Sequence, residues 1–267
     1  MSIYWILFLV ALAVSAVGFK KFLYFISIGY GFSIAALAVA LVIKFHAVLT
    51  LPTAILCLIL FAYGCRLGGY LLLREIRSAS YRKVIAENVK EDGYPLGVTI
   101  CIWVACAFLY MAEVAPVASM LHNASQGLPV NTLWAWIGAA VMVCGVALEA
   151  AADAQKSAAK KVNPRRFVDT GLYRIVRCPN YLGEMLLWTG CLLVCIGGCC
   201  NWWQWLISVL GYVTIVYIMF SGARRLEIRQ DKSYGADPEY HQYKKTTPIL
   251  LPLLPVYSVK KHSWLRG

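Results

Sequence analysis

The sequence predicts an all-α membrane protein with seven transmembrane helices. Of its 267 residues, 60% are hydrophobic and only 14% are charged, which is less charge than soluble domains usually carry. Apolar stretches of about twenty residues, the length that crosses a bilayer as a helix, recur along the chain. The predicted spans cover about residues 2–18, 22–43, 47–73, 97–121, 133–155, 180–199 and 202–221.

The remaining segments predict a single membrane domain, residues 1–267, with a tail at residues 222–267. The first span begins at Met1-Ser2-Ile3-Tyr4 without a basic region, so we interpret it as a helix rather than a cleaved signal peptide. Within the tail, Asp237-Pro238 has the pattern of a helix start, with Asp as the N-cap and Pro in the first turn. The prolines from Pro248 to Pro255 exclude a regular helix there.

The basic residues predict how the spans are oriented. The net charge is +12, and nearly all Lys and Arg fall in connections on one side of a seven-span chain. The positive-inside rule then places the N-terminus outside and the C-terminal tail in the cytosol. Topology and contact with anionic lipid explain this charge, so nucleic acid is not an expected partner. The basic segments hold Lys20 and Lys21, then Arg74, Arg77, Arg82, Lys83 and Lys90, then residues 156–177 and 224–266, with Lys44 on the other side.

The ten cysteines predict packing rather than metal binding. Most of them lie within spans, and Cys191, Cys195 and Cys199 recur every fourth residue as one stripe of a helix. No CxxC and no paired His/Cys spacing occurs, so no metal site is expected. In an outer connection, Asn123-Ala-Ser matches the pattern of a glycosylation acceptor.

Polar side chains gather within the spans close to the predicted cytosolic side. They are Arg66 in the third span, Glu149 and Asp153 in the fifth, and Asn180 and Glu184 in the sixth. The members of each of the last two pairs are four residues apart and share one helix face. A charge in the bilayer centre costs roughly 2.5–3.5 kcal/mol, so the group predicts a polar cavity open to the cytosol. The alternative is that these groups snorkel or pair as packing contacts.

The segment Gly171–Glu184 has the sequence G-L-Y-R-I-V-R-C-P-N-Y-L-G-E, where a basic loop enters the sixth span. It resembles the membrane steroid 5α-reductase family and its bacterial relatives, and the resemblance covers most of the chain. The resemblance implies a seven-helix fold with NADPH in a cytosol-facing cavity and a 3-oxo-Δ4-steroid or similar lipid enone as substrate. The related isoprenylcysteine carboxyl methyltransferases share a similar pattern but generally lack the Asn and Glu. Cys178 replaces the His that both groups have before the proline.

The same resemblance implies roles for individual residues. Tyr63 matches the catalytic tyrosine that hydrogen-bonds the 3-keto oxygen of the substrate. The matching cofactor-binding positions are Arg66, Arg77, Asp153, Lys160, Tyr173, Asn180, Glu184, Arg224 (or its neighbour Arg225) and Glu227, with Tyr240 and Tyr243 as weaker matches. Animal members also have an acid that assists the tyrosine, whereas this chain has no Asp or Glu before Glu75. Tyr30 is the candidate replacement. Glu113, in the outer half of the fourth span, is either a buried hydrogen-bonded acid or a substrate contact.

The residue types also fit conjugate reduction on chemical grounds. Hydride addition to an enone places negative charge on the carbonyl oxygen, and a neutral phenol donates to that oxygen as the charge develops. An amide and a carboxylate suit the carboxamide of nicotinamide. Several Arg and Lys side chains suit a pyrophosphate and a 2′-phosphate, which favours NADPH over NADH. No G-x-G-x-x-G follows a strand pattern, so a Rossmann domain is not expected.

Three functions remain open from the sequence. The leading hypothesis is a monomeric NADPH-dependent reductase of the C4–C5 double bond of 3-oxo-Δ4-steroids or similar lipid enones. The second is a methyltransferase that uses S-adenosylmethionine on a membrane thiol or acid. The third, a lipid-binding or transport protein, predicts polar groups through both leaflets, whereas only Glu113 lies across from the other acids.

Overall fold

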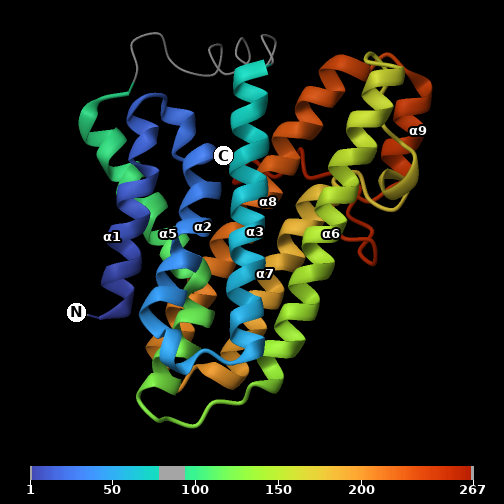
Figure 1. Ribbon diagram of the computed structural model, residues 1–267. Helices are drawn as coiled ribbons and strands as arrows, with labels where there is room; N and C mark the ends of the chain where they lie inside the picture. The colour runs from blue at the N-terminus through green and yellow to red at the C-terminus, as the bar shows by residue number, and fades with distance from the viewer. Residues whose placement is uncertain (1, 78–93, 266–267) are drawn as a thin grey trace. The chain divides into compact units, whose positions relative to one another are not determined.

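The computed structural model describes residues 2–77 and 94–265, which form helices and turns without a strand (Figure 1). This confirms the all-α prediction. The helices are α1 (Ile3–Ser15), α2 (Ile28–Phe45), α3 (Leu51–Arg77), α5 (Leu96–Ser125), α6 (Leu133–Val162), α7 (Pro179–Gly198), α8 (Trp202–Tyr234) and α9 (Pro238–Thr246). Short 3-10 segments lie at Ala16–Phe19, Phe22–Tyr24, His46–Val48 and Gly171–Arg174. Arg82, Lys83, Lys90 and Arg266, counted above among the basic residues, lie outside the described residues.

Six of the described helices are long and apolar enough to cross a membrane, which confirms an integral membrane protein. They are α2 with its flanking turns, α3, α5, α6, α7 and α8. The first predicted span does not form such a helix. α1 has only 13 residues and is about 20 Å long, which is shorter than the roughly 30 Å thickness of the hydrocarbon core of a bilayer. The chain turns after Ser15, and at Gly18 an added Cβ would lie within the ring of Phe25. That ring occupies the space a continuing helix would need for a side chain.

Two helices extend farthest beyond their predicted spans. α6 has 30 residues and α8 has 33, which corresponds to about 45 and 50 Å at the rise of an α-helix. Both exceed the hydrocarbon thickness, so part of each helix must lie outside it, and we expect this of the polar last turns. Hydropathy falls near residues 155 and 221, but the backbone stays helical through polar sequence to Val162 and Tyr234. Lys160, Lys161 and Lys232 in the last turns complement the negative end of each helix dipole.

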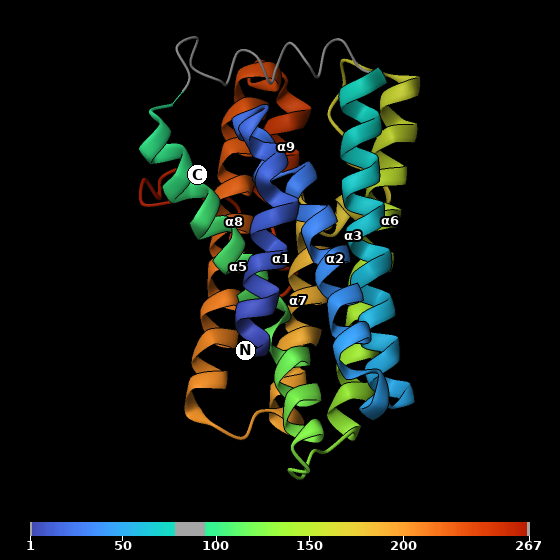
Figure 2. The same ribbon diagram turned by 60° about the vertical axis from the view of Figure 1, so that its left-hand side comes forward.

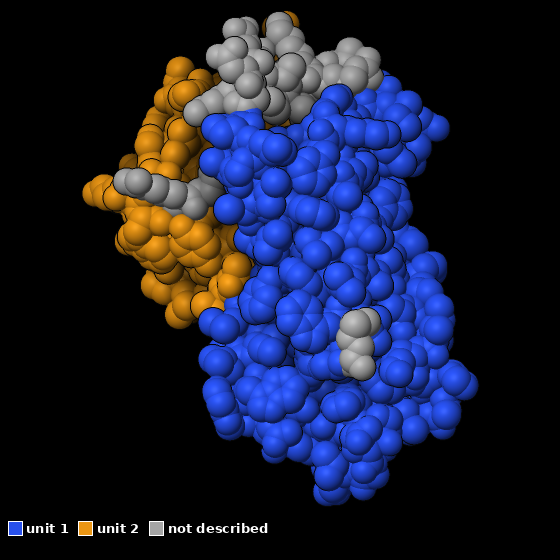
Figure 3. Space-filling view, turned by 90° about the vertical axis from the view of Figure 1, so that its left-hand side faces the viewer, with its two compact units in different colours: residues 1–139, 191–212 blue, residues 140–190, 213–267 orange. Residues whose placement is uncertain are grey.

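The chain forms two compact units, each made of two separated stretches (Figure 3). Unit 1 comprises residues 1–139 and 191–212, and unit 2 comprises residues 140–190 and 213–267. In unit 1, α1 packs against α2 and α5, and α2 packs against α3 (Figure 2). Unit 2 holds the C-terminal parts of α6 and α8, the first turns of α7, and α9.

Small residues bring α2 and α3 into close contact in unit 1. A Cβ added at Gly64 would lie 2.5 Å from the carbonyl oxygen of Gly31, and one at Gly31 would lie 2.5 Å from the backbone nitrogen of Gly68. Such close approach of backbones is typical of membrane helix pairs. It also sets Tyr30, next to Gly31 on α2, beside Tyr63 on α3.

Replacing Gly64 with Leu should therefore lower the thermal stability of the protein in detergent. The new side chain must push α2 away from α3, and overpacking of this kind costs about 1–3 kcal/mol or more. Gly69→Leu is the matched control, because a Cβ at Gly69 meets nothing within 4 Å. Melting temperatures of the purified variants check the prediction, and equal values for the two variants would contradict the packing of this helix pair.

The predicted glycosylation site at Asn123 is wrong. Asn123 lies inside α5 and is only 1% exposed. Its Nδ2 donates to the carbonyl of Gly198 at 2.7 Å and to Oε1 of Gln204 at 3.0 Å, while Nε2 of Gln204 donates back to Oδ1 of Asn123 at 3.0 Å. Both ends of the amide are therefore used inside unit 1. A three-residue pattern gives no indication of burial, so it could not distinguish this pair from an exposed acceptor.

In unit 2, glycines again allow close helix contacts. A Cβ at Gly145 of α6 would lie 2.5 Å from the backbone nitrogen of Leu187, and one at Gly183 of α7 would lie 2.7 Å from that of Glu149. On α8, a Cβ at Gly222 would lie 3.3 Å from the ring of Tyr181. These contacts hold the first turns of α7 against α6 and α8.

The tail folds back on unit 2. α9 begins as predicted, with Oδ1 of Asp237 accepting from the backbone N–H of Glu239 at 2.9 Å. The proline-rich stretch after it is not helical, as expected. It pairs instead with the segment before α7, where the N–H of Arg177 donates to Pro248 at 2.9 Å and that of Cys178 donates to Ile249 at 3.0 Å. The C-terminal segment, residues 248–265, is thus joined by backbone hydrogen bonds to the segment Gly171–Glu184.

Candidate functional site

Three buried tyrosines from three helices form a cluster in unit 1, which we call the tyrosine cluster: Tyr30, Tyr63 and Tyr110. The hydroxyl oxygens of Tyr30 and Tyr63 lie 3.4 Å apart, and the side chain of Tyr63 is fully buried. The ring of Tyr30 lies 5.1 Å from that of Tyr110, whose hydroxyl donates to the carbonyl of Phe25. The predicted catalytic tyrosine therefore has a second tyrosine as its hydroxyl partner.

The other predicted residues of unit 1 lie at different depths. Glu113 is buried, one turn beyond Tyr110 on α5, and its backbone carbonyl accepts from the Cys191 thiol at 3.3 Å. Arg66 is partly exposed on α3, one turn beyond Tyr63. Arg77 is exposed at the end of α3, about 21 Å along the helix axis from Tyr63, so it cannot touch the tyrosine cluster.

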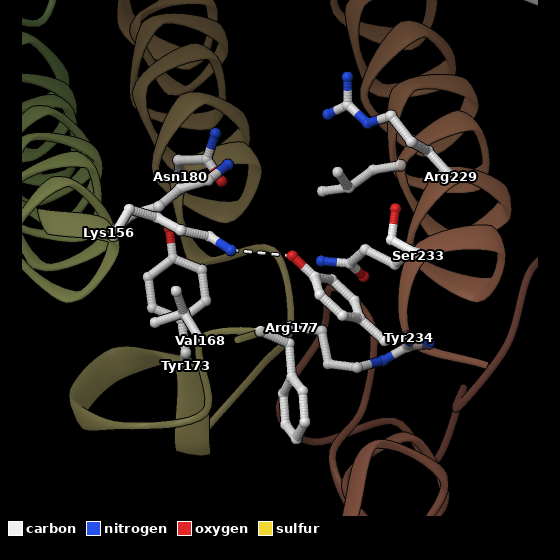
Figure 4. A pocket seen from close by; sticks show the side chains of 12 residues that line it. Lys156, Val168, Tyr173, Arg177, Asn180, Arg229, Ser233 and Tyr234 are labelled. Carbon is white, nitrogen blue, oxygen red and sulfur yellow. Dashed lines mark hydrogen bonds between the residues drawn. The ribbon is translucent and has the colours of Figure 1, made fainter. Parts of the chain in front are cut away.

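Unit 2 contains a pocket lined by the end of α6, the loop before α7, the first turn of α7 and the end of α8 (Figure 4). Its volume is about 140 Å³. Of its twelve lining residues none is acidic, and four are basic, namely Lys156, Lys160, Arg177 and Arg229. We call it the cationic pocket. Its charge suits an anionic group.

Three predicted cofactor contacts line the cationic pocket: Lys160, Tyr173 and Asn180. The ammonium of Lys160 donates to the carbonyls of Pro164 and Arg166 and, at 2.8 Å, to the hydroxyl of Tyr234, which Figure 4 shows as a dashed line. These hydrogen bonds hold one wall of the pocket in place, and the ammonium group adds positive charge to the pocket. The hydroxyl of Tyr173 donates to the carbonyl of Ala152 at 3.3 Å.

Four other predicted contacts, Asp153, Glu184, Arg224 and Glu227, are not among the twelve lining residues. Arg224 donates from Nε to the carbonyl of Lys260 at 3.1 Å. Glu227 is 1% exposed and accepts from the backbone N–H of Val259 at 3.0 Å. These two residues therefore hold the C-terminal segment. Asp153 is partly exposed on α6, and Glu184 is buried one turn beyond Asn180 on α7.

Sequence reasoning missed three of the basic lining residues. Lys156 lies one turn before Lys160, so its position on the same helix face was a usable signal. Arg177 belongs to the segment Gly171–Glu184. Its charge alone does not indicate that the side chain is buried. Arg229 follows Glu227 by two residues on α8, and only the helical continuation past residue 221 brings it to the pocket.

The sequence profile of a family described as "Protein of unknown function (DUF1295)" matches residues 6–247. The chain belongs to this DUF1295 family. No curated protein and no solved structure matches it. The matched region contains the tyrosine cluster and every lining residue of the cationic pocket. The C-terminal segment that pairs with Arg177 lies beyond it.

Cys178 of this DUF1295 chain is a neutral, buried thiol. It stands where the resembling families have His, directly before α7. Burial raises the pKa of the Cys178 thiol to about 12, so the group stays protonated at neutral pH. It supplies neither a thiolate nucleophile nor the charge that a protonated histidine would bring.

The residues present fit the phosphate end of a dinucleotide. Nε and Nη1 of Arg177, a lining residue of the pocket, are buried and have no hydrogen-bond partner among the described residues, so this arginine has unused donors beside several cations. Its volume of about 140 Å³ is below the roughly 300–1,000 Å³ that encloses a drug-sized ligand. The cationic pocket of this DUF1295 chain therefore suits one or two phosphate groups rather than a whole cofactor.

Proposed function

We propose that the protein is a membrane reductase that uses NADPH to reduce the C4–C5 double bond of 3-oxo-Δ4-steroids or similar lipid enones. The observation that carries the proposal is the buried hydroxyl pair of Tyr30 and Tyr63, 3.4 Å apart. A phenol hydroxyl can both donate and accept hydrogen bonds, so Tyr63 has the chemistry to donate to a substrate carbonyl while it accepts from Tyr30. Two phenols in an apolar site match a reaction that builds charge on an oxygen.

The proposed roles of the residues follow from the chemistry of an enone. Reduction adds a hydride at the β-carbon and a proton at the α-carbon, and negative charge develops on the carbonyl oxygen between these events. NADPH supplies the hydride when it is bound. Tyr63 donates its hydroxyl proton into a hydrogen bond with the carbonyl oxygen. Tyr30 supports the developing charge by donating to Tyr63, in place of the acid found in animal members of the resembling family.

Charge favours NADPH over S-adenosylmethionine as the cofactor. NADPH carries a pyrophosphate and a 2′-phosphate, whereas S-adenosylmethionine carries a sulfonium and an ammonium with one carboxylate. Of the twelve described residues that line the cationic pocket, four are basic and none is acidic, so it attracts phosphates and repels a sulfonium. The 2′-phosphate also gives a reason for NADPH to bind more tightly than NADH.

Calorimetry on the purified protein in lipid nanodiscs tests the proposal directly. NADPH should bind, NADH should bind more weakly, and progesterone or testosterone should be reduced in the presence of NADPH. Binding of S-adenosylmethionine without binding of NADPH would overturn the assignment and favour the methyltransferase.

Asn180→Ala should weaken NADPH binding about tenfold. Asn180 presents an amide donor and acceptor to the cationic pocket from the first turn of α7, and loss of a buried hydrogen bond costs about 0.5–1.5 kcal/mol or more. Asn131→Ala, in unit 1, is the control for loss of an amide elsewhere. The measurement is the NADPH dissociation constant, and equal constants for the two variants would remove Asn180 from the site.

A further inference from the structure

Arg177 has an unusual hydrogen-bond inventory for a buried arginine. Its side chain is 1% exposed, and Nη2 donates to the carbonyl of Tyr257 and to Oε1 of Glu227, the latter at 3.3 Å. A guanidinium has five N–H donors, so three remain on Nε and Nη1. Both of these atoms are buried without a partner in the described part of the chain. Buried donors are normally satisfied, so this pattern indicates a missing acceptor.

The surroundings of Arg177 show which kind of acceptor fits. Arg177 lines the cationic pocket together with Lys156, Lys160 and Arg229, and Figure 4 shows its side chain beside Tyr234 at the pocket wall. The acid paired with Arg177 is Glu227, which also binds Lys244 at 3.0 Å. One carboxylate therefore serves two cations. The pocket keeps an excess of positive charge, which favours an anion with several oxygen acceptors.

We propose that Arg177 is a phosphate-binding residue, whose Nε and Nη1 donate to the oxygens of a phosphate ester seated in the cationic pocket. The inference rests on the proposed function only for the carrier of that phosphate, which would be NADPH. The anion site itself rests on the buried donors and on the charge of the lining residues.

The C-terminal segment positions this arginine. Glu227 is held by the N–H of Val259 at 3.0 Å, and the carbonyl of Tyr257 holds Nη2, so two contacts to residues 257–259 fix the guanidinium. Arg177 also anchors that segment through its own N–H to Pro248. Phosphate binding and docking of the segment therefore share one residue.

Calorimetry with inorganic pyrophosphate at fixed ionic strength tests the site on the full-length protein. The key variant is Arg177→Gln/Glu227→Gln, which removes both buried charges and leaves neither unpaired. It should bind pyrophosphate at least about tenfold more weakly than the wild type. The surface control Lys161→Gln should stay within about threefold of the wild type.

Arg177→Lys is a second test that keeps the ion pair with Glu227 but removes the guanidinium donors. It should also weaken pyrophosphate binding about tenfold, while the melting temperature of each variant reports folding. Normal pyrophosphate binding by the double variant, or none by the wild type, overturns the inference. So does an equal loss in Lys161→Gln and the double variant, because the loss would then not depend on the guanidinium of Arg177.

The two proposals fail in different ways. If the double variant loses pyrophosphate but the wild type does not reduce an enone with NADPH, the phosphate site stands and the reductase assignment falls. If the wild type reduces the enone and the double variant binds pyrophosphate normally, the reductase stands and the role of Arg177 falls.

Discussion

Tyr63→Phe should reduce the turnover of progesterone or testosterone by about a hundredfold or more, while NADPH still binds. Loss of one donor to a developing oxyanion typically lowers the rate of the chemical step about 10²–10³-fold. The substitution removes only the hydroxyl, and Tyr63 is fully buried against Tyr30 on the closely packed α2–α3 pair. The phenyl ring keeps that packing, so folding should be preserved. Steady-state kinetics and NADPH calorimetry on the same preparation separate the two effects.

Two further substitutions define the role of the tyrosine cluster. Tyr30→Phe should lower turnover less, about tenfold, because it removes only the support that Tyr30 gives to Tyr63. Tyr70→Phe is the matched control, since Tyr70 lies two turns further along α3 and is 42% exposed. Full activity of the Tyr63→Phe variant would remove the tyrosine cluster from the mechanism, whatever the cofactor proves to be.

The sequence predicts the membrane helices well because long apolar segments have few alternatives in a bilayer. The six spanning helices and the start of α9 at Asp237-Pro238 agree with the prediction. Helix ends were predicted less well, since hydropathy marks where apolar sequence stops rather than where helical hydrogen bonds stop. α6 and α8 continue through polar residues, and α1 ends early beside Gly18, where the ring of Phe25 fills the space.

The residues of the candidate site were also predicted only in part. Tyr63, Tyr173 and Asn180 were singled out by the motif and the resemblance, and the last two line the cationic pocket. The contacts of Arg224 and Glu227 with the C-terminal segment were not predictable, because they are made to backbone groups more than 30 residues further along the chain. Linear spacing carries no information about such a return, so a structural anchor and a ligand contact look alike in the sequence.

Arg229→Glu should weaken the binding of NADPH by about a hundredfold. Arg229 lies in the polar C-terminal part of α8, beyond the predicted span, and lines the cationic pocket without a carboxylate among its lining neighbours. Reversing the charge of residue 229 replaces attraction to a phosphate with repulsion. At an effective dielectric constant of about 20, two unit charges at contact distance interact by a few kcal/mol before solvent screening. Arg229 is exposed, so screening reduces this to roughly 2–3 kcal/mol.

Lys232→Glu supplies the matched control, because Lys232 is an exposed cation on the same helix that does not line the pocket. It makes the same change in net charge, so any general field effect appears equally in both variants. NADPH dissociation constants measured at low and high salt check the comparison. Arg229→Glu should bind weakly and show a smaller salt dependence than the wild type, since one phosphate contact fewer remains to be screened. Equal dissociation constants for the two variants would mean that the nucleotide phosphates lie away from the end of α8, and the proposed cofactor site would have to be sought elsewhere.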